Sequence, residues 1–283
     1  MSPSAASTHP HAACHVNRDR ALLRTETLVI EEPLEIRIVS QGREEVVTVT
    51  MRTPGADQEL ALGFLIAERI LHDASQVKVI RRCGQRSNVI KVELRAGAAP
   101  QLKSVARNFV SSASCGLCGK TSLDAVSTLG SMESIECSAR PIPASFLYGI
   151  PQRLRAAQQV FDVTGGLHAV AAFDLGGELL AVHEDVGRHN AVDKVIGTLA
   201  SRNWRPDNTL FALSGRAGFE LVQKTAAVQV PIIVAIGAPS SLAVQLAEQV
   251  GITLVGFLRA ASFNVYTHPQ RLEQHVVPVR EAV

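Results

Sequence analysis

The fold is decided by residues 209–258, whose sequence is TLFALSGRAGFELVQKTAAVQVPIIVAIGAPSSLAVQLAEQVGITLVGFL. Three apolar runs in it, 209–213, 232–236 and 252–258, alternate with two segments of helical periodicity, 218–228 and 241–250. Strands that alternate with helices of about ten residues predict a parallel sheet covered by helices.

Two further strands precede this stretch. Residues 168–173 and 178–183 flank Leu175-Gly176-Gly177, which predicts a hairpin that adds an antiparallel edge to the sheet. A helix is predicted to begin at Asn190. We therefore expect an α/β unit over residues 141–283, with a mostly parallel sheet and helices on both faces.

The N-terminal half is patterned differently. Apolar and β-branched residues predict strands at 34–39, 45–51, 77–81 and 89–94, with a helix over 57–71 between the two pairs. This order predicts a smaller α+β unit over residues 21–140, and the proline-rich residues 138–151 mark the boundary. Residues 1–20 have no apolar run typical of a signal peptide, so we expect a disordered tail.

Length and composition restrict the class of protein. The 283 residues suggest two domains. A net charge of +2 argues against nonspecific electrostatic binding of nucleic acid. No segment reaches the roughly 18 continuous apolar residues of a membrane span. The odd number of cysteines does not form a disulfide framework. We therefore expect a cytoplasmic protein that contacts neither membrane nor nucleic acid.

The segment most suited to chemistry is Ser114-Cys115-Gly116-Leu117-Cys118-Gly119-Lys120. A helix is predicted over 121–129, so its dipole and Lys120 favour the thiolate form of the cysteines. A zinc site would need a second cysteine pair, and a thioredoxin-like pair would need a preceding core strand. An inert turn is a further alternative. A mobile, reactive thiol pair agrees best with the pattern, and no metal site is predicted.

Polar residues follow the predicted strands of the larger unit, where ligands bind in sheets of this kind. They comprise His189, Arg216, Ser240, Ser241 and Arg259. Helix N-termini and arginines both bind phosphate, so together they favour a nucleotide-like ligand over a set of ordinary loops.

Four other polar residues have structural explanations. His168 and His183 lie on predicted strands, where a hydrogen-bonded histidine is commoner than a metal ligand. Asp193 and Lys194 lie one turn into a predicted helix, and we expect them to pair with neighbouring side chains.

The chain resembles the formate dehydrogenase accessory sulfurtransferase family over nearly its whole length beyond the tail. Several motifs in register carry the resemblance. They are Cys115-Gly116-Leu117-Cys118-Gly119, Thr164-Gly165-Gly166-Leu167-His168, Glu184-Asp185-Val186-Gly187-Arg188-His189-Asn190-Ala191-Val192-Asp193-Lys194, Ser214-Gly215-Arg216, Ala238-Pro239-Ser240-Ser241, Gly256-Phe257-Leu258-Arg259 and Phe263-Asn264-Val265-Tyr266-Thr267.

The resemblance implies a sulfur carrier. Such a protein takes persulfide sulfur from a cysteine desulfurase and passes it to the bis-molybdopterin guanine dinucleotide molybdenum cofactor before that cofactor enters formate dehydrogenase. Cys115 would hold the persulfide, and Cys118 would assist transfer. The segment Phe257, Leu258, Arg259, Ala260, Ala261 and Ser262 would contact the cofactor, which nucleotides such as GDP would mimic. The resemblance also implies a cytidine-deaminase-like fold for the larger unit and a homodimer. Ala260-Ala261-Ser262 replaces the glycines and arginine typical of the family, so one cation is missing there.

Three other functions are weighed against the carrier. Zinc-dependent deamination needs His-x-Glu and Pro-Cys-x-x-Cys ligands. Glu184 follows His183 directly and no proline precedes Cys115, so the ligands for deamination are missing. A non-catalytic chaperone would bind the dinucleotide without Cys115, and a disulfide reductase would need both cysteines and no nucleotide.

Overall fold

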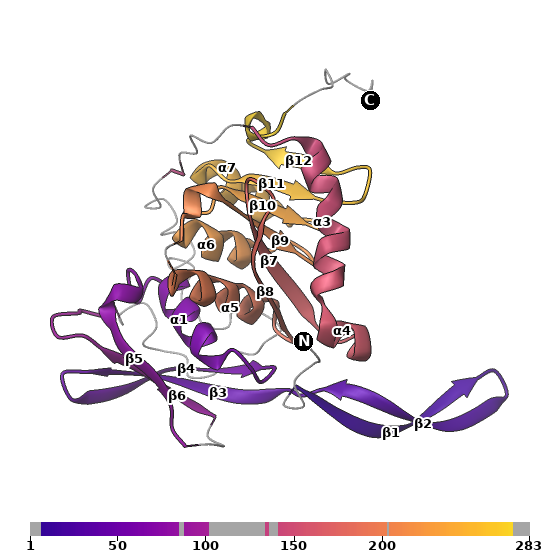
Figure 1. Cartoon of the computed structure of the whole chain (residues 1–283), viewed down its shortest axis with the longest axis horizontal. Coiled ribbons are helices and arrows are strands. Elements are labelled where there is room, and N and C mark those ends of the chain that lie inside the picture. The colour runs from indigo at the N-terminus through magenta and orange to yellow at the C-terminus, as the bar shows by residue number, and fades with distance from the viewer. Residues whose placement is uncertain (1–6, 85–87, 102–133, 136–140, 203, 274–283) are drawn as a thin grey trace.

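A six-stranded sheet forms the centre of the larger unit in the computed structural model, which describes residues 7–84, 88–101, 134–135, 141–202 and 204–273 (Figure 1). Its strand order is β12-β11-β10-β9-β7-β8. These strands are β7 (His168–Asp174), β8 (Leu179–Asp185), β9 (Thr209–Leu213), β10 (Ile232–Ala235), β11 (Thr253–Gly256) and β12 (Asn264–Thr267). Its helices are α3 (Ala144–Ala157), α4 (Gln159–Thr164), α5 (Arg188–Ala200), α6 (Phe219–Ala227) and α7 (Ser241–Val250).

The sheet is mixed, and the prediction of a mostly parallel sheet is wrong. β9 pairs in parallel with β10, and β10 with β11, because α6 and α7 carry the chain back across the sheet between them. β7 is antiparallel to both β8 and β9, and β12 is antiparallel to β11. The predicted edge hairpin is confirmed as β7–β8, whereas β12 was not predicted.

Both faces of the sheet are covered, as expected. Along β7, Val170 and Ala172 belong to one hydrophobic cluster, which includes residues of α5, α6 and α7. Ala171 and Phe173 point to the other face, where α3 contributes Leu147. This alternation follows from the period of two residues along a strand.

The helix α3 begins within the proline-rich residues 138–151, where we expected the boundary between the units and had predicted no helix. Pro143 is its N-cap residue, Pro151 lies inside it, and one face buries Leu147, Ile150 and Leu154. Burial of this apolar face against the sheet outweighs the unfavourable effect of an interior proline. The predicted limit between residues 140 and 141 adjoins residues that the structure does not describe, and it stays a prediction.

In the described part of the smaller unit, α1 packs against a four-stranded sheet of order β4-β3-β6-β5. Its elements are β3 (Glu32–Ser40), β4 (Arg43–Arg52), α1 (Asp57–Ala67), β5 (Val77–Arg82) and β6 (Val89–Leu94), with a 3-10 turn at Ala74–Gln76. These strands agree closely with the prediction. The helix ends earlier than the predicted residue 71.

The two units share one core. The cluster that includes Leu34 and Ile90 of the smaller unit continues to Val195 and Phe211 of the larger unit. α1 packs directly on α5 through two glycines. A Cβ at Gly63 would lie 1.8 Å from the Asp193 carbonyl oxygen, and one at Gly197 would lie 1.9 Å from the Glu59 carbonyl oxygen. Only glycine allows the two helix backbones to approach so closely.

The N-terminal residues correct a second prediction. Residues 8–17, which we expected in a disordered tail, form β1 (Thr8–Asn17) and pair in antiparallel register with β2 (Arg20–Val29). This ribbon projects from the rest of the molecule (Figure 1). The first strand, β1, is rich in alanine and histidine, so its strand propensity is low and no strand was predicted there. Pairing with β2, which contains β-branched residues, stabilises β1 as a strand.

Candidate functional site

All six strands of the larger sheet have one terminus at the same edge. The carboxyl ends of β8, β9, β10 and β11 lie there, and so do the amino ends of β7 and β12, because β7 runs antiparallel to β9 and β12 runs antiparallel to β11. This edge therefore collects most of the polar residues predicted to follow the strands. It is the candidate site.

His168 lies on this edge with Arg188, His189 and Arg216 in its electrostatic surroundings. Burial lowers the pKa of His168 below its ordinary value of 6.5, and the neighbouring Arg188 and His189 lower it further, as does Arg216. His168 is therefore neutral near pH 7. The His189 Nε2 atom also lies 2.6 Å from a carboxylate oxygen of Glu220 at the start of α6. His189 and Arg216, both predicted site residues, are thus brought together around a histidine that the sequence assigned to structure.

The loops after β9, β10 and β11 pack on one another through their backbones. The Gly237 amide donates to the Gly215 carbonyl oxygen at 2.9 Å, and the Phe257 amide donates to the Gly237 carbonyl oxygen at 3.1 Å. A Cβ at Gly237 would lie 2.9 Å from the Arg216 amide nitrogen. Glycine at this position therefore lets the loop carrying Arg216 lie directly against the next strand end.

The segment 257–262 turns at the end of β11. Phe257 has a φ of 52° and its side chain is 43% exposed, so the strand ends one residue earlier. The Arg259 amide donates to the Ser262 carbonyl oxygen at 2.8 Å, and Arg259, Ala260, Ala261 and Ser262 are exposed. Leu258 is fully buried and supports the turn from beneath.

Arg259 reaches from this turn toward the neighbouring strand end. Its guanidinium donates to the Ile236 carbonyl oxygen at 2.6 Å. A pocket of about 580 Å³ lies next to this contact. It is lined by Ile236, His168 and Ser214 on one side and by residues of α3 and α4 on the other. A second pocket, of about 760 Å³, lies under Ala261 and Ser262. Arg259 and two cavities therefore lie along this edge of the sheet.

Ser240 and Ser241 begin α7 at the same edge. The Ser240 hydroxyl accepts a hydrogen bond from the Ala243 amide at 3.2 Å, so it caps the helix. Both serines are exposed. Their place at a helix N-terminus is suited to an anionic group.

Much of the motif from Glu184 to Lys194 joins the two units. The Asp185 carboxylate is fully buried, accepts a hydrogen bond from the Thr53 amide at 3.2 Å, and lies 2.6 Å from the Lys194 ammonium. Lys194 donates to the Thr53 carbonyl oxygen, and Asn190 bonds Thr50. The prediction that Lys194 pairs with a neighbour is confirmed.

Two other parts of the motif are also structural. The Glu184 carboxylate accepts hydrogen bonds from the Val160 and Phe161 amides at the start of α4. Asp193 forms an ion pair, as expected, but its partner at 2.9 Å is Lys224, which was not predicted, and Glu68 contacts the same ammonium. Burial alone would lower the pKa of Lys224, but the two carboxylates outweigh this effect and raise it. No signal in one sequence identifies contacts between residues this far apart.

Cys115 and Cys118 lie outside the described residues, as does the helix predicted over 121–129. The structure does fix the chain on either side. The Gln101 amide donates to the Ile70 carbonyl oxygen just after α1, and the Ile135 amide donates to the Val250 carbonyl oxygen at the end of α7. α7 runs antiparallel to the strands that flank it, so its end lies at the amino edge of the sheet, opposite the candidate site.

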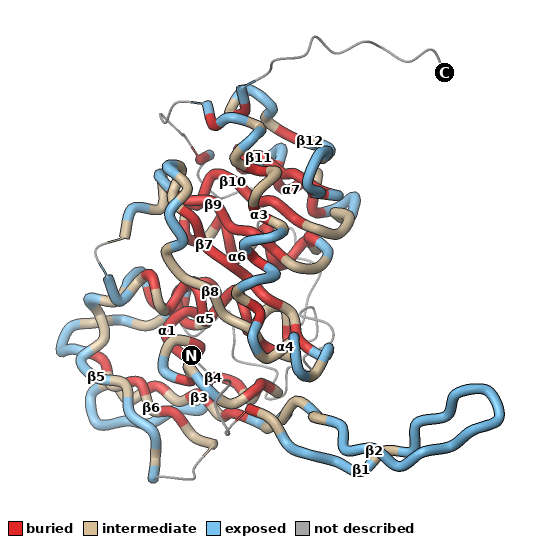
Figure 2. Tube along the Cα trace, turned by 45° about the vertical axis from the view of Figure 1, so that its right-hand side comes forward, coloured by how far each residue is buried: buried red, intermediate tan, exposed pale blue. Residues whose placement is uncertain are grey.

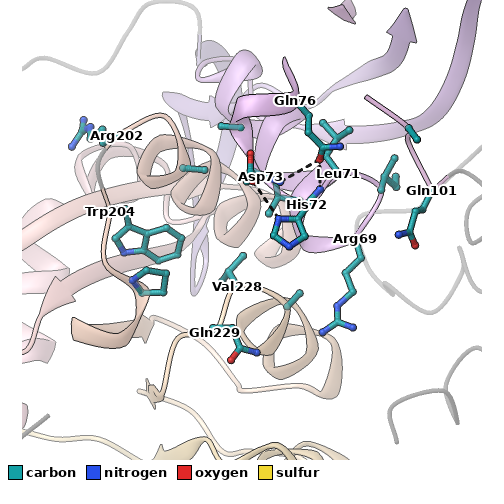
Figure 3. A pocket seen from close by; sticks show the side chains of 17 residues that line it. Arg69, Leu71, His72, Asp73, Gln76, Gln101, Arg202, Trp204, Val228 and Gln229 are labelled. Carbon is teal, nitrogen blue, oxygen red and sulfur yellow. Dashed lines mark hydrogen bonds and ion pairs between the residues drawn. The ribbon is translucent and has the colours of Figure 1, made fainter. Parts of the chain in front are cut away.

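A pocket of about 650 Å³ opens beside Gln101 at this amino edge. It is lined by the C-terminal ends of α1, α5 and α6, and Figure 3 shows Arg69, His72 and Trp204 around it. Within the described ranges, no group of three or more histidine, cysteine or acidic side chains is arranged to hold a metal ion. None of the helices described is long and apolar enough to cross a membrane.

Known proteins are similar to this chain over most of its length. The sequence profile of the FdhD/NarQ family matches residues 29–273. The chain belongs to this family. The sulfur carrier protein FdhD of Mycolicibacterium paratuberculosis is 49% identical over 266 residues, which cover 91% of this chain and 96% of that protein. The sulfur carrier protein FdhD of Picrophilus torridus is 40% identical over 258 residues, covering 91% and 95%.

A solved structure supports the fold of this FdhD/NarQ family member. A formate dehydrogenase accessory protein from Desulfotalea psychrophila superposes with a TM-score of 0.73 and 23% sequence identity, covering 94% of this chain and all of that chain. At this identity the comparison establishes the shared fold alone.

Proposed function

We propose that the protein is a sulfur carrier that accepts persulfide sulfur from a cysteine desulfurase and delivers it to the bis-molybdopterin guanine dinucleotide molybdenum cofactor of formate dehydrogenase. The observation that carries this proposal is the similarity, over about nine tenths of the chain, to proteins named sulfur carrier protein FdhD. The cytidine-deaminase-like arrangement of the larger unit remains part of the proposal.

Cys115 accepts the sulfur in this proposal. Its thiolate attacks the outer sulfur of the desulfurase persulfide, a new S–S bond forms on Cys115, and the desulfurase cysteine leaves as a thiolate. The reaction exchanges one S–S bond for another and needs no external oxidant. Cys118, three residues away, assists the onward transfer.

The cofactor is the substrate that receives the sulfur, and the carboxyl edge of the sheet is its proposed binding surface. Arg216 and Arg259 supply bidentate donors for its phosphates, and the start of α7 at Ser240 supplies free amides. The exposed ring of Phe257 and its neighbouring segment supply an apolar surface for a guanine base. These features fit a dinucleotide, since the cations and the apolar surface lie on adjacent strand ends.

Sulfur donor and acceptor approach from different edges in this proposal. The chain on both sides of Cys115 is anchored at the amino edge of the sheet. The 14 residues from Gln101 to Cys115 span at most about 46 Å when fully extended, whereas the five residues of β9 span about 17 Å. The tether is therefore long enough for Cys115 to serve a donor at one edge and an acceptor at the other.

The competing function is a chaperone that binds the guanine dinucleotide without moving sulfur. Formate dehydrogenase activity in cells that lack their own carrier separates the two. A sulfur carrier restores activity as the wild type and fails as Cys115→Ala, although the variant accumulates to the same level. Full activity with Cys115→Ala would favour the chaperone.

A further inference from the structure

The pocket of about 580 Å³ lies between the strand ends of the candidate site and the segment that joins α3 to α4. α4 has no buried residue and lies at the surface of the molecule (Figure 2). Much of the pocket wall is apolar and comes from Pro151, Leu154, Phe161, Leu167 and Ile236. Pockets of this size that combine apolar walls with a few polar groups are typical of sites for small organic molecules.

Gln158 places a buried amide on the wall of this pocket. The residue is 5% exposed and lies at the junction of the two helices, as the C-cap residue of α3 and the N-cap residue of α4. Its side chain does not cap α4, because the Glu184 carboxylate accepts hydrogen bonds from the Val160 and Phe161 amides instead. Within the described ranges, the Gln158 side chain has no hydrogen-bond partner. Burying an amide without a partner is unfavourable, so this one points to a ligand.

His168 is the second polar group of the pocket without a partner. In the part of the chain that the structure describes, no side chain or backbone group hydrogen-bonds its ring. Gly215 leaves room for the ring, because a Cβ there would lie 3.3 Å from His168 Nδ1. Burial lowers the pKa of His168, as do Arg188, His189 and Arg216, so the ring is neutral near pH 7. A neutral imidazole offers one donor and one acceptor to a ligand.

A flat heteroaromatic ring with an amide-like edge is the ligand chemistry that suits these groups. The carboxamide of a glutamine presents an acceptor beside a donor, and therefore pairs with a ring that carries an N–H beside a C=O. The apolar walls, with Phe161 among them, pack against the faces of such a ring. Guanine and pterin both have this edge, since both contain a 2-amino-4-oxopyrimidine ring. Both rings also occur in the proposed sulfur acceptor.

We propose that the pocket of Gln158 and His168 binds the pterin ring of the sulfur acceptor, an inference that rests on the proposed function. There, the exposed ring of Phe257 at the end of β11 is the surface for guanine. β11 is three places from β7 in the sheet, which corresponds to about 14 Å. The Arg259 guanidinium, bonded to the Ile236 carbonyl oxygen at 2.6 Å, lies between them at the end of β10. Phosphates held by Arg259 thus have the guanine on one side and the pterin, in the pocket, on the other.

Pterin itself is the probe, and its fluorescence measures the bound fraction in equilibrium dialysis against the full chain. Gln158→Leu keeps the size of the side chain and removes the amide, whereas Gln159→Leu makes the same change at the exposed neighbouring residue outside the pocket. We expect the wild type to bind pterin, Gln158→Leu to weaken binding at least ~10-fold, and Gln159→Leu to change it less than ~2-fold, because only the first removes the paired amide. His168→Phe, which keeps a ring without nitrogens, should also weaken binding.

Competition with guanosine separates the two ring systems. Guanosine should displace pterin poorly, and Gln158→Leu should bind GDP as tightly as the wild type, because guanine lies on Phe257. Gln158→Leu should also unfold at the wild-type temperature or above it, since the lost amide bonds nothing in the described part of the protein. The proposal is overturned by a wild type that does not bind pterin, by equal pterin affinity of the wild type and Gln158→Leu, or by guanosine that displaces pterin as readily as pterin itself.

Sulfur uptake separates the pterin pocket from the proposed function. Loading of Cys115 by the desulfurase does not involve the pocket, so Gln158→Leu should gain sulfur as the wild type does. A wild type that gains sulfur but does not bind pterin overturns the pocket assignment alone. A wild type that binds pterin through Gln158 but gains no sulfur overturns the sulfur-carrier function and supports the pocket as a pterin site.

Discussion

The carboxylate of Asp185 lies 2.6 Å from the ammonium of Lys194, and both side chains are buried between the two units. Thr53 of the smaller unit bonds to both of them. The ion pair thus completes a polar contact between β8, α5 and the end of β4, in a region where water has little access. Its partners come from parts of the chain that are more than 130 residues apart.

We predict that Asp185→Asn lowers the free energy of unfolding by about 3–5 kcal/mol, because it leaves the Lys194 ammonium buried without a counter-charge. Guanidinium denaturation followed by circular dichroism measures this change. The double variant Asp185→Asn with Lys194→Met should recover part of the loss, since it removes the unpaired charge.

Asp207→Asn is the matched control. Asp207 pairs with Arg205 on the surface, where both side chains are exposed. We expect a change within about 0.5 kcal/mol for this variant. Equal effects at Asp185 and Asp207 would contradict the structural role assigned to the buried pair.

The glycine contact between α1 and α5 gives a second prediction. Gly63→Ala or Gly197→Ala forces a methyl group into the backbone of the facing helix, so each should destabilise the fold by about 3 kcal/mol or more. Gly149→Ala, within α3, meets nothing within 4 Å and should be neutral or stabilising. Thermal unfolding of the three variants tests this directly. If Gly63→Ala changed the stability as little as Gly149→Ala, the close crossing of α1 and α5 would be ruled out.

His183 predicts how stability depends on pH. Burial, followed by Lys194 and Arg202, lowers the pKa of His183 from 6.5 to about 4 in the folded protein. Between pH 6.5 and pH 4 the histidine is protonated in the unfolded chain but stays neutral in the folded protein. The contribution of His183 to the free energy of unfolding is therefore complete above pH 6.5 and is lost as the pH falls from 6.5 toward 4. The difference corresponds to about 3 kcal/mol.

His183→Gln should flatten this acid limb while keeping an acceptor or donor for the Thr198 hydroxyl, which lies 2.7 Å from the ring. His72→Gln serves as control because its side chain is 91% exposed. Denaturation curves between pH 7 and pH 4 compare the three proteins. A wild type and a His183→Gln variant with parallel pH profiles would disprove the assignment.

Nucleotide binding tests the carboxyl edge. If Arg216 and Arg259 contact phosphates of the cofactor, Arg216→Ala and Arg259→Ala should each weaken GDP binding at least about tenfold. Arg205→Ala should not, since Arg205 precedes the amino end of β9. Calorimetric titration with GDP measures the affinity of the wild type and of the three variants. Equal affinities of all four proteins would show that GDP does not bind at this edge of the sheet.

The sequence allowed a correct prediction of the elements that rest on local periodicity. β9, α6, β10 and α7 lie within one or two residues of their predicted bounds because apolar runs and helical spacing alternate cleanly there. α3 was missed because Pro151 signals a break that burial of Leu147 and Leu154 overrides. The direction of β7 relative to β9 depends on long-range pairing, which periodicity does not encode.

The site could be predicted only in part. Strand-end position was enough to select His189 and Arg216, which both lie near His168, but not His168 itself, because its place at this edge arises from β7 running antiparallel. The motif around Asp185 was noted in the sequence for its family resemblance, and the structure shows that its buried carboxylate joins the two units. Cys115 and Cys118 remain predictions from the sequence and the family.

The most direct test of the sulfur-carrier function is the intact mass of the protein after incubation with a cysteine desulfurase and cysteine. The wild type and Cys118→Ala should each gain one sulfur atom that a thiol reductant removes, and Cys115→Ala should gain none, because the Cys115 thiolate is the attacking group. A wild type that binds GDP but gains no sulfur would contradict the sulfur-carrier function and leave the chaperone as its explanation.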